Sequence, residues 1–79
     1  MQDIDQLIQS DKPWAAQRAQ MALAIMNQAQ MGQISRDEAR ELLEDLVRTD
    51  ALEAEADDMQ TKAMLVTAIY GFTQILSAV

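Results

Sequence analysis

The chain has 79 residues and a formal net charge of −7, from thirteen acidic and six basic side chains. This length fits one small domain over 1–79, and the excess of acid, with no basic cluster to offset it, disfavours nucleic-acid binding. The sequence contains no cysteine and no histidine, which excludes disulfides and the commonest metal ligand and general base. We therefore expect a non-enzymatic protein without cofactor or metal, stabilised by helix packing or oligomerisation.

The first predicted element is a short helix or arm over residues 1–10, with Ile4, Leu7 and Ile8 on one face. A helix of this length is marginal in water, so we expect it either to dock on the rest of the chain or to fray. The same stretch lacks the basic region and apolar run of a secretory signal. We therefore expect a cytoplasmic location or one within a larger assembly.

The second predicted element is a helix over residues 13–30, which Pro13 would open in its first turn, with Asp11 as the better capping side chain. Its apolar residues fall on two faces, which indicates that it is covered on more than one side. The first face contains Trp14, Met21, Ile25 and Ala29, and the second contains Ala15, Ala19, Ala22 and Met26.

The third element, over residues 35–49, has the clearest start signal in the chain. Gly32 suits the left-handed residue that ends the preceding helix, and Ser35 with Glu38 forms a capping box flanked by Ile34 and Ala39 at the hydrophobic-staple positions. The helix is amphipathic, and the short link before it predicts an antiparallel hairpin with the second helix. Its apolar face contains Ala39, Leu42, Leu43, Leu46 and Val47. Arg40 to Glu44 and Glu44 to Arg48 are spaced for ion pairs.

The segment from Gly32 to Ala39, followed by Leu42 and Leu43, resembles the Gly-x-Ile-Ser/Thr-x-x-Glu turn of many short helical modules. It is also similar in style to small helical proteins of bacteriophages. The resemblance covers about a quarter of the chain, consists of general capping chemistry and carries no particular function with it.

The last predicted element is one long helix over residues 51–79, roughly 43 Å at 1.5 Å per residue. The alternative is a helix that starts at Asp57-Asp58, with Asp57 or Asp58 as its cap. Residues 63–79 contain no charged side chain, but the run is short of the about twenty apolar residues of a membrane span and lacks basic flanks, so a membrane anchor is disfavoured. Gly71 indicates either close approach of a neighbouring backbone or a kink, and the pattern does not choose between them.

This uncharged segment has two apolar stripes. The first contains Leu65, Ile69, Phe72, Leu76 and Val79, and the second contains Met59, Ala63, Val66 and Tyr70. One stripe can be covered by the preceding helices, whereas the other needs a second subunit, a partner protein or lipid. The predicted fold is thus all-α, an antiparallel hairpin plus a long C-terminal helix, assembled into a helical oligomer.

The favoured function is protein–protein interaction or structural assembly by self-association through the C-terminal helix, as in a component of a bacteriophage or a secretion apparatus. The predicted partner is a second copy or another protein. The residues predicted to form the interface are Leu65, Ile69, Phe72, Leu76, Val79, Trp14 and Tyr70. Four methionines are a further option, as an adaptable groove for a partner helix, although such residues more often fill a core. The methionines concerned are Met21, Met26, Met59 and Met64.

The alternative is an acidic inhibitor or chaperone that binds a basic partner through residues 37–58. The predicted acidic face contains Asp37, Glu41, Glu44, Asp45, Glu53, Asp57 and Asp58. A plain solvated flank is the simpler interpretation of such a run. The spacing lacks the alternating oxygen ligands and the glycine of a calcium-binding loop, so no calcium site is predicted.

Overall fold

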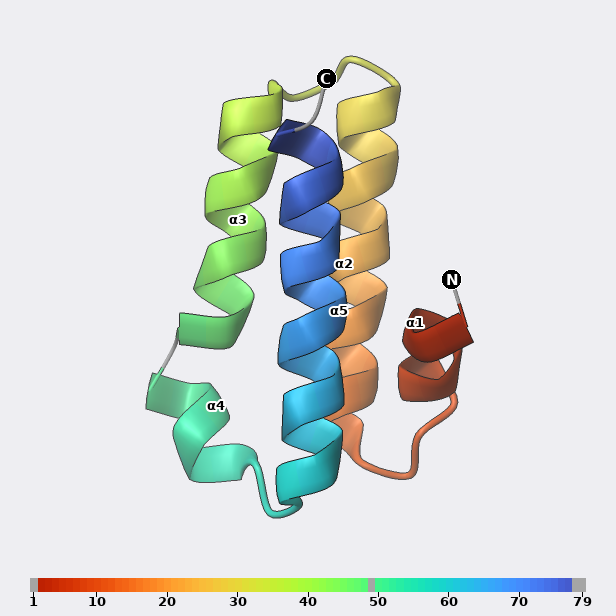
Figure 1. Ribbon diagram of the computed structural model, residues 1–79, viewed down its shortest axis with the longest axis vertical. Coiled ribbons are helices and arrows are strands. Elements are labelled where there is room, and N and C mark those ends of the chain that lie inside the picture. The colour runs from red at the N-terminus through yellow and green to blue at the C-terminus, as the bar shows by residue number, and fades with distance from the viewer. Residues whose placement is uncertain (1, 49, 78–79) are drawn as a thin grey trace.

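The computed structural model describes residues 2–48 and 50–77, and all regular structure within them is helical (Figure 1). Two long helices and one of intermediate length form the body, and two short helices lie at its margins. In chain order the helices are α1 Gln2–Ile8, α2 Pro13–Gln30, α3 Arg36–Arg48, α4 Asp50–Glu55 and α5 Met59–Ser77.

The three longer helices pack side by side into a bundle (Figure 1), and the fold as a whole measures 34 × 25 × 19 Å. Helices α2 and α3 form the predicted antiparallel hairpin, and α5 packs against both and runs parallel to α2 (Figure 1). Helix α1 docks on α2 and α5, while α4 contacts α3. None of the helices within the described residues is long and apolar enough to cross a membrane.

The core is formed where these helices face one another. Helix α1 docks through Ile4 and Leu7, which are 2% and 1% exposed. Three alanines of α2 are fully buried, which lets the neighbouring helices approach closely because alanine has only a methyl side chain. The other large side chains that are fully or almost fully buried are Leu43, Leu52, Leu65, Ile69 and Phe72.

The turn between α2 and α3 follows the predicted chemistry. Gly32 has a φ of 76°, the left-handed conformation that glycine adopts without steric cost. The Ser35 Oγ accepts a hydrogen bond of 3.0 Å from the backbone N–H of Glu38, which caps α3. Ile34 and Ala39 are both packed into the core. The predicted cap and hairpin are therefore confirmed.

The prediction of one helix over residues 51–79 is wrong. The helix is interrupted between Glu55 and Met59, and α4 and α5 are separate elements. Asp58 caps the start of α5, as the alternative prediction had it, and a continuous helix of roughly 43 Å would overrun the longest dimension of 34 Å. Residues 49, 78 and 79 of the predicted helices lie outside the described residues.

The start of α2 also differs from the prediction. Lys12 is the N-cap residue and makes no side-chain capping bond, so Asp11 does not serve as the cap. The chain is instead held before the helix by Ser10, whose Oγ accepts a hydrogen bond of 3.1 Å from the Lys12 backbone N–H. Pro13 occupies the first turn, where its missing N–H leaves no partner unsatisfied.

Candidate interaction surface

The first apolar stripe of α5 faces the interior of the chain. Leu65 and Ile69 are 0% exposed, Phe72 is 2% and Leu76 is 8%. Trp14 of α2 is also buried, at 7% exposure. The prediction that these five residues form an intermolecular interface is therefore corrected, because the chain's own helices already cover them. Val79, also predicted there, lies outside the described residues.

The opposite side of α5 is exposed and uncharged. We call it the outer face, and it consists of Ala63, Met64, Thr67, Tyr70, Gln74 and Ile75. The largest of these side chains are substantially open to solvent: Tyr70 is 44% exposed and Ile75 is 47%. Met59, at the start of the helix, is 77% exposed. The outer face combines an exposed aromatic ring and two large apolar side chains with small and neutral polar residues.

Part of the outer face was predicted and part was missed. The second predicted stripe contains Ala63 and Tyr70, which are exposed, and Val66, which is half-buried. Ile75 belonged to neither stripe. Its spacing of four residues from Gly71 and eight from Thr67 places it at the margin of the face that Thr67 and Gln74 share.

Gly71 lies at the edge of the outer face and is half-buried. Its φ is not positive, and a Cβ built on it would meet no atom within 4 Å. Helix α5 continues without a break on both sides of it. The interpretation that a neighbouring backbone of the same chain approaches Gly71 is therefore excluded.

Two hydroxyl groups near the C-terminal end of α5 donate hydrogen bonds to backbone carbonyls of the same helix. The Thr73 hydroxyl donates to the Tyr70 carbonyl at 2.7 Å, and the Ser77 hydroxyl donates to the Thr73 carbonyl at 3.0 Å. Ser77 Oγ also accepts a hydrogen bond of 3.0 Å from Arg40 of α3, which ties the end of α5 to the hairpin. These contacts stabilise the C-terminal part of α5 from within the chain.

The acidic residues of the predicted acidic face are largely engaged in intramolecular contacts. Four of them form ion pairs with cations of the chain: Asp37 with Arg40 at 3.0 Å, Glu44 with Arg48 at 3.0 Å, Glu53 with Lys62 at 2.7 Å, and Asp57 with Lys12 at 3.6 Å. The predicted pair from Arg40 to Glu44 is thus replaced by one from Arg40 to Asp37. Glu41 and Asp45 are exposed and form no ion pair within the described residues.

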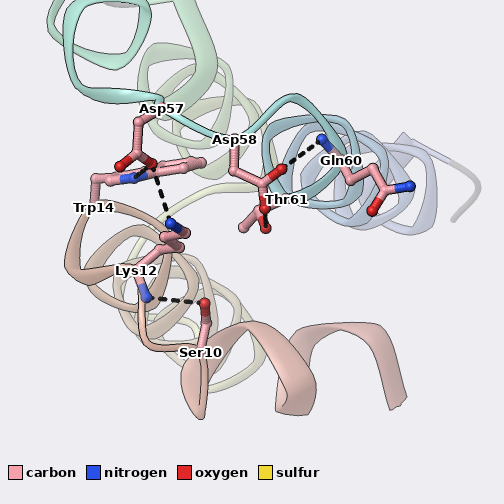
Figure 2. Close-up of polar contacts among 7 residues, drawn as sticks. All are labelled: Ser10, Lys12, Trp14, Asp57, Asp58, Gln60 and Thr61. Atoms are coloured by element: carbon pink, nitrogen blue, oxygen red, sulfur yellow. Dashed lines mark hydrogen bonds and ion pairs between the residues drawn. The ribbon is translucent and has the colours of Figure 1, made fainter.

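Asp57 links the turn before α5 to the start of α2 (Figure 2). Its Oδ1 accepts a hydrogen bond of 3.2 Å from Trp14 Nε1–H and lies 3.6 Å from the Lys12 ammonium. The polar edge of the buried indole is therefore satisfied by a residue 43 positions away. This contact joins the turn between α4 and α5 to the first turn of α2.

Asp58 has a capping role at the start of α5 (Figure 2). Its carboxylate accepts a hydrogen bond from the Thr61 hydroxyl and another, of 3.2 Å, from the Gln60 backbone N–H. The bond from Thr61 is the main reason that the pKa of Asp58 lies below its usual value. The carboxylate is therefore held in its charged form by the helix that it caps.

A surface cavity of about 360 Å³ lies between the C-terminal ends of α2 and α5 and the start of α3. Its lining residues are Met26, Ala29, Gln30, Arg36, Ile75 and Leu76. Arg36 is the sole charged residue of this lining, so the cavity does not bring together a pair of titratable groups suited to acid–base chemistry. Within the described residues no group of three or more side chains is arranged to hold a metal ion.

Comparison with known proteins adds no family to this description. No protein-family model, no curated protein and no solved structure matches the chain. The exposed outer face of α5 and the exposed acids of α3 are therefore the features that bear on function.

Proposed function

We propose that this chain is a non-enzymatic helical protein that self-associates through the outer face of α5. The observation that supports this proposal is an exposed face without charge, with Tyr70 near its middle, on an otherwise acidic chain. Aromatic side chains with a polar tip are enriched where proteins contact one another. The interface predicted from the first apolar stripe is thus replaced by the opposite side of the same helix.

Charge distribution favours a second copy as the partner. Each chain has a net charge of −7, so two copies repel one another at most orientations. All charged residues lie outside residues 63–79, and α3 and α4 hold most of the acids. Contact between two outer faces requires no buried charge and leaves the acidic side chains solvated.

The size of the face predicts weak association. Nineteen residues of α5 extend about 28 Å at 1.5 Å per residue, and a contact confined to one such helix buries less than the roughly 800 Å² per partner of a standard interface. We therefore expect a concentration-dependent equilibrium rather than a permanent oligomer.

Sedimentation equilibrium between roughly 10 µM and 1 mM, the range of weak complexes, tests the proposal. We expect the average mass of the natural chain to rise above that of one chain with concentration, and Tyr70→Asp to abolish the rise by placing a charge in the contact. Gln17→Asp is the matched control, since it adds the same charge at an exposed position of α2. A natural chain that remains a monomer at all concentrations would refute the proposal.

A second candidate is an acidic surface on α3 for a basic partner. Glu41 and Asp45 are exposed and one helical turn apart, and no cation of the described residues pairs with them. Like charges at this spacing destabilise a helix slightly, and a basic partner would relieve this. Binding through this surface should slow steeply with added salt, whereas salt-insensitive binding would contradict it.

A further inference from the structure

We propose that Gly71 marks the point at which α5 of a second copy crosses α5 at close range. This inference rests on the proposed self-association and adds the position of the contact within the outer face. It follows from the presence of a glycine inside a helix, for which no contact within the described residues gives a reason.

Glycine inside a helix is destabilising relative to alanine, and it is typically found where the backbone needs a positive φ or where another group must come close to it. The first reason does not apply, since Gly32 is the glycine with positive φ. The second does not apply within the described chain, since a Cβ on Gly71 would have no neighbour within 4 Å. A group outside the chain is the remaining reason for the missing side chain.

The surroundings of Gly71 suit a helix as that group. Thr67, Gln74 and Ile75 are its neighbours on the helix surface at three and four residues' distance. Tyr70 is adjacent in sequence and exposed. Bare backbone at Gly71 therefore lies among side chains that offer apolar contact and neutral hydrogen-bonding groups, without a charge that would have to be desolvated.

A second copy meets this surface with the same features. In a two-fold symmetric pair each subunit contributes the same patch, so one glycine near the axis removes two side chains from the crossing. Helices cross at 8–10 Å depending on the side chains at the contact, and a glycine allows the short end of this range. Closer approach increases the contact between two faces that are otherwise narrow.

Gly71→Leu tests the position, with Gly71→Ala as a milder change and Ala24→Leu as the matched control on the exposed side of α2. Far-UV circular dichroism and thermal unfolding at low concentration should show each variant folded, with Gly71→Ala more stable than the natural chain, because the Cβ meets no atom. By sedimentation, we expect self-association at least about tenfold weaker for Gly71→Leu and about as strong as in the natural chain for Ala24→Leu.

The outcomes separate this inference from the proposal on which it rests. If Gly71→Leu associates as tightly as the natural chain or more tightly, while Tyr70→Asp dissociates, the crossing lies elsewhere on the outer face and this inference fails alone. A natural chain that never self-associates overturns both. If Gly71→Ala and Gly71→Leu fail to fold at low concentration, glycine is required within the protomer and the inference is overturned.

Discussion

The two faces of α5 come from one uncharged segment and differ in their content of neutral polar side chains. The inner face presents large aliphatic and aromatic groups such as Leu65 and Phe72, which are buried against the hairpin. The outer face presents Thr67, Gln74 and Tyr70, which tolerate water. The comparison teaches that absence of charge alone does not identify a core. Neutral polar side chains distinguish the face that remains open, since large side chains such as Tyr70 and Ile75 also occur on it.

The largest expected loss of stability comes from removing the side chain of Phe72, which is 2% exposed. It tests whether the protomer depends on the inner face of α5. Phe72→Ala should lower the free energy of unfolding by about 3–5 kcal/mol, since it removes a buried ring and leaves a cavity. A small domain has only about 5–15 kcal/mol in total. Urea unfolding at a concentration where the chain is monomeric provides the measurement.

Tyr70→Ala is the matched change on the outer face. Because Tyr70 is 44% exposed, we expect it to change monomer stability by no more than about 0.5 kcal/mol. Similar losses for Phe72→Ala and Tyr70→Ala would show that the protomer depends on both faces, and the distinction between inner and outer face would be wrong.

An effect between those of Phe72 and Tyr70 concerns Trp14, the other aromatic residue with a polar tip that was predicted at the interface. Unlike Tyr70, it is buried and donates its indole N–H to Asp57. Trp14→Phe should cost on the order of 1 kcal/mol of stability because it removes this hydrogen bond, without changing self-association. In a double-mutant cycle followed by circular dichroism, Trp14→Phe and Asp57→Ala should be non-additive; additive losses would show that the bond contributes nothing.

Local signals in the sequence were sufficient where a few adjacent residues determine the backbone. Gly32, Ser35 and Glu38 predicted the turn and the start of α3 because capping depends on neighbours in the chain. The all-α class and the antiparallel hairpin followed from the same signals. The oligomer predicted with them is not tested by this fold and stays a prediction.

Long-range packing was the part that the pattern could not supply. Residues 51–59 read as continuous helix because Ala, Leu and Glu all favour helix. The break depends on Asp58 bonding Thr61 and on Asp57 reaching Trp14 across the fold. Which stripe of α5 faces inward likewise depends on where α2 and α3 lie, and the stripe that was predicted to form an interface is the one that the chain itself buries.

The smallest predicted effect is the pH dependence of the cap at the start of α5. The pKa of Asp58 is lowered in the folded chain, chiefly by the hydrogen bond from Thr61. A carboxyl group with a depressed folded pKa adds stability that is complete above its unfolded pKa of about 3.9. This stability is lost as the pH falls toward the lower, folded value. Asp58→Asn cannot titrate but keeps an oxygen acceptor for the N-terminal turn.

We therefore expect the stability difference between the natural chain and Asp58→Asn, measured by urea unfolding, to narrow as the pH is lowered from 6 toward 3, since acid removes the charge that only the natural chain has. In the Thr61→Val variant, the free energy of unfolding should depend less on pH than in the natural chain. This change removes the hydrogen bond that is the main cause of the lowered pKa of Asp58. A stability difference that stays constant across this range would show that Asp58 titrates alike in the folded and unfolded chain. In that case the cap would act through its hydrogen bonds, and the charge of Asp58 would contribute nothing to the stability of α5.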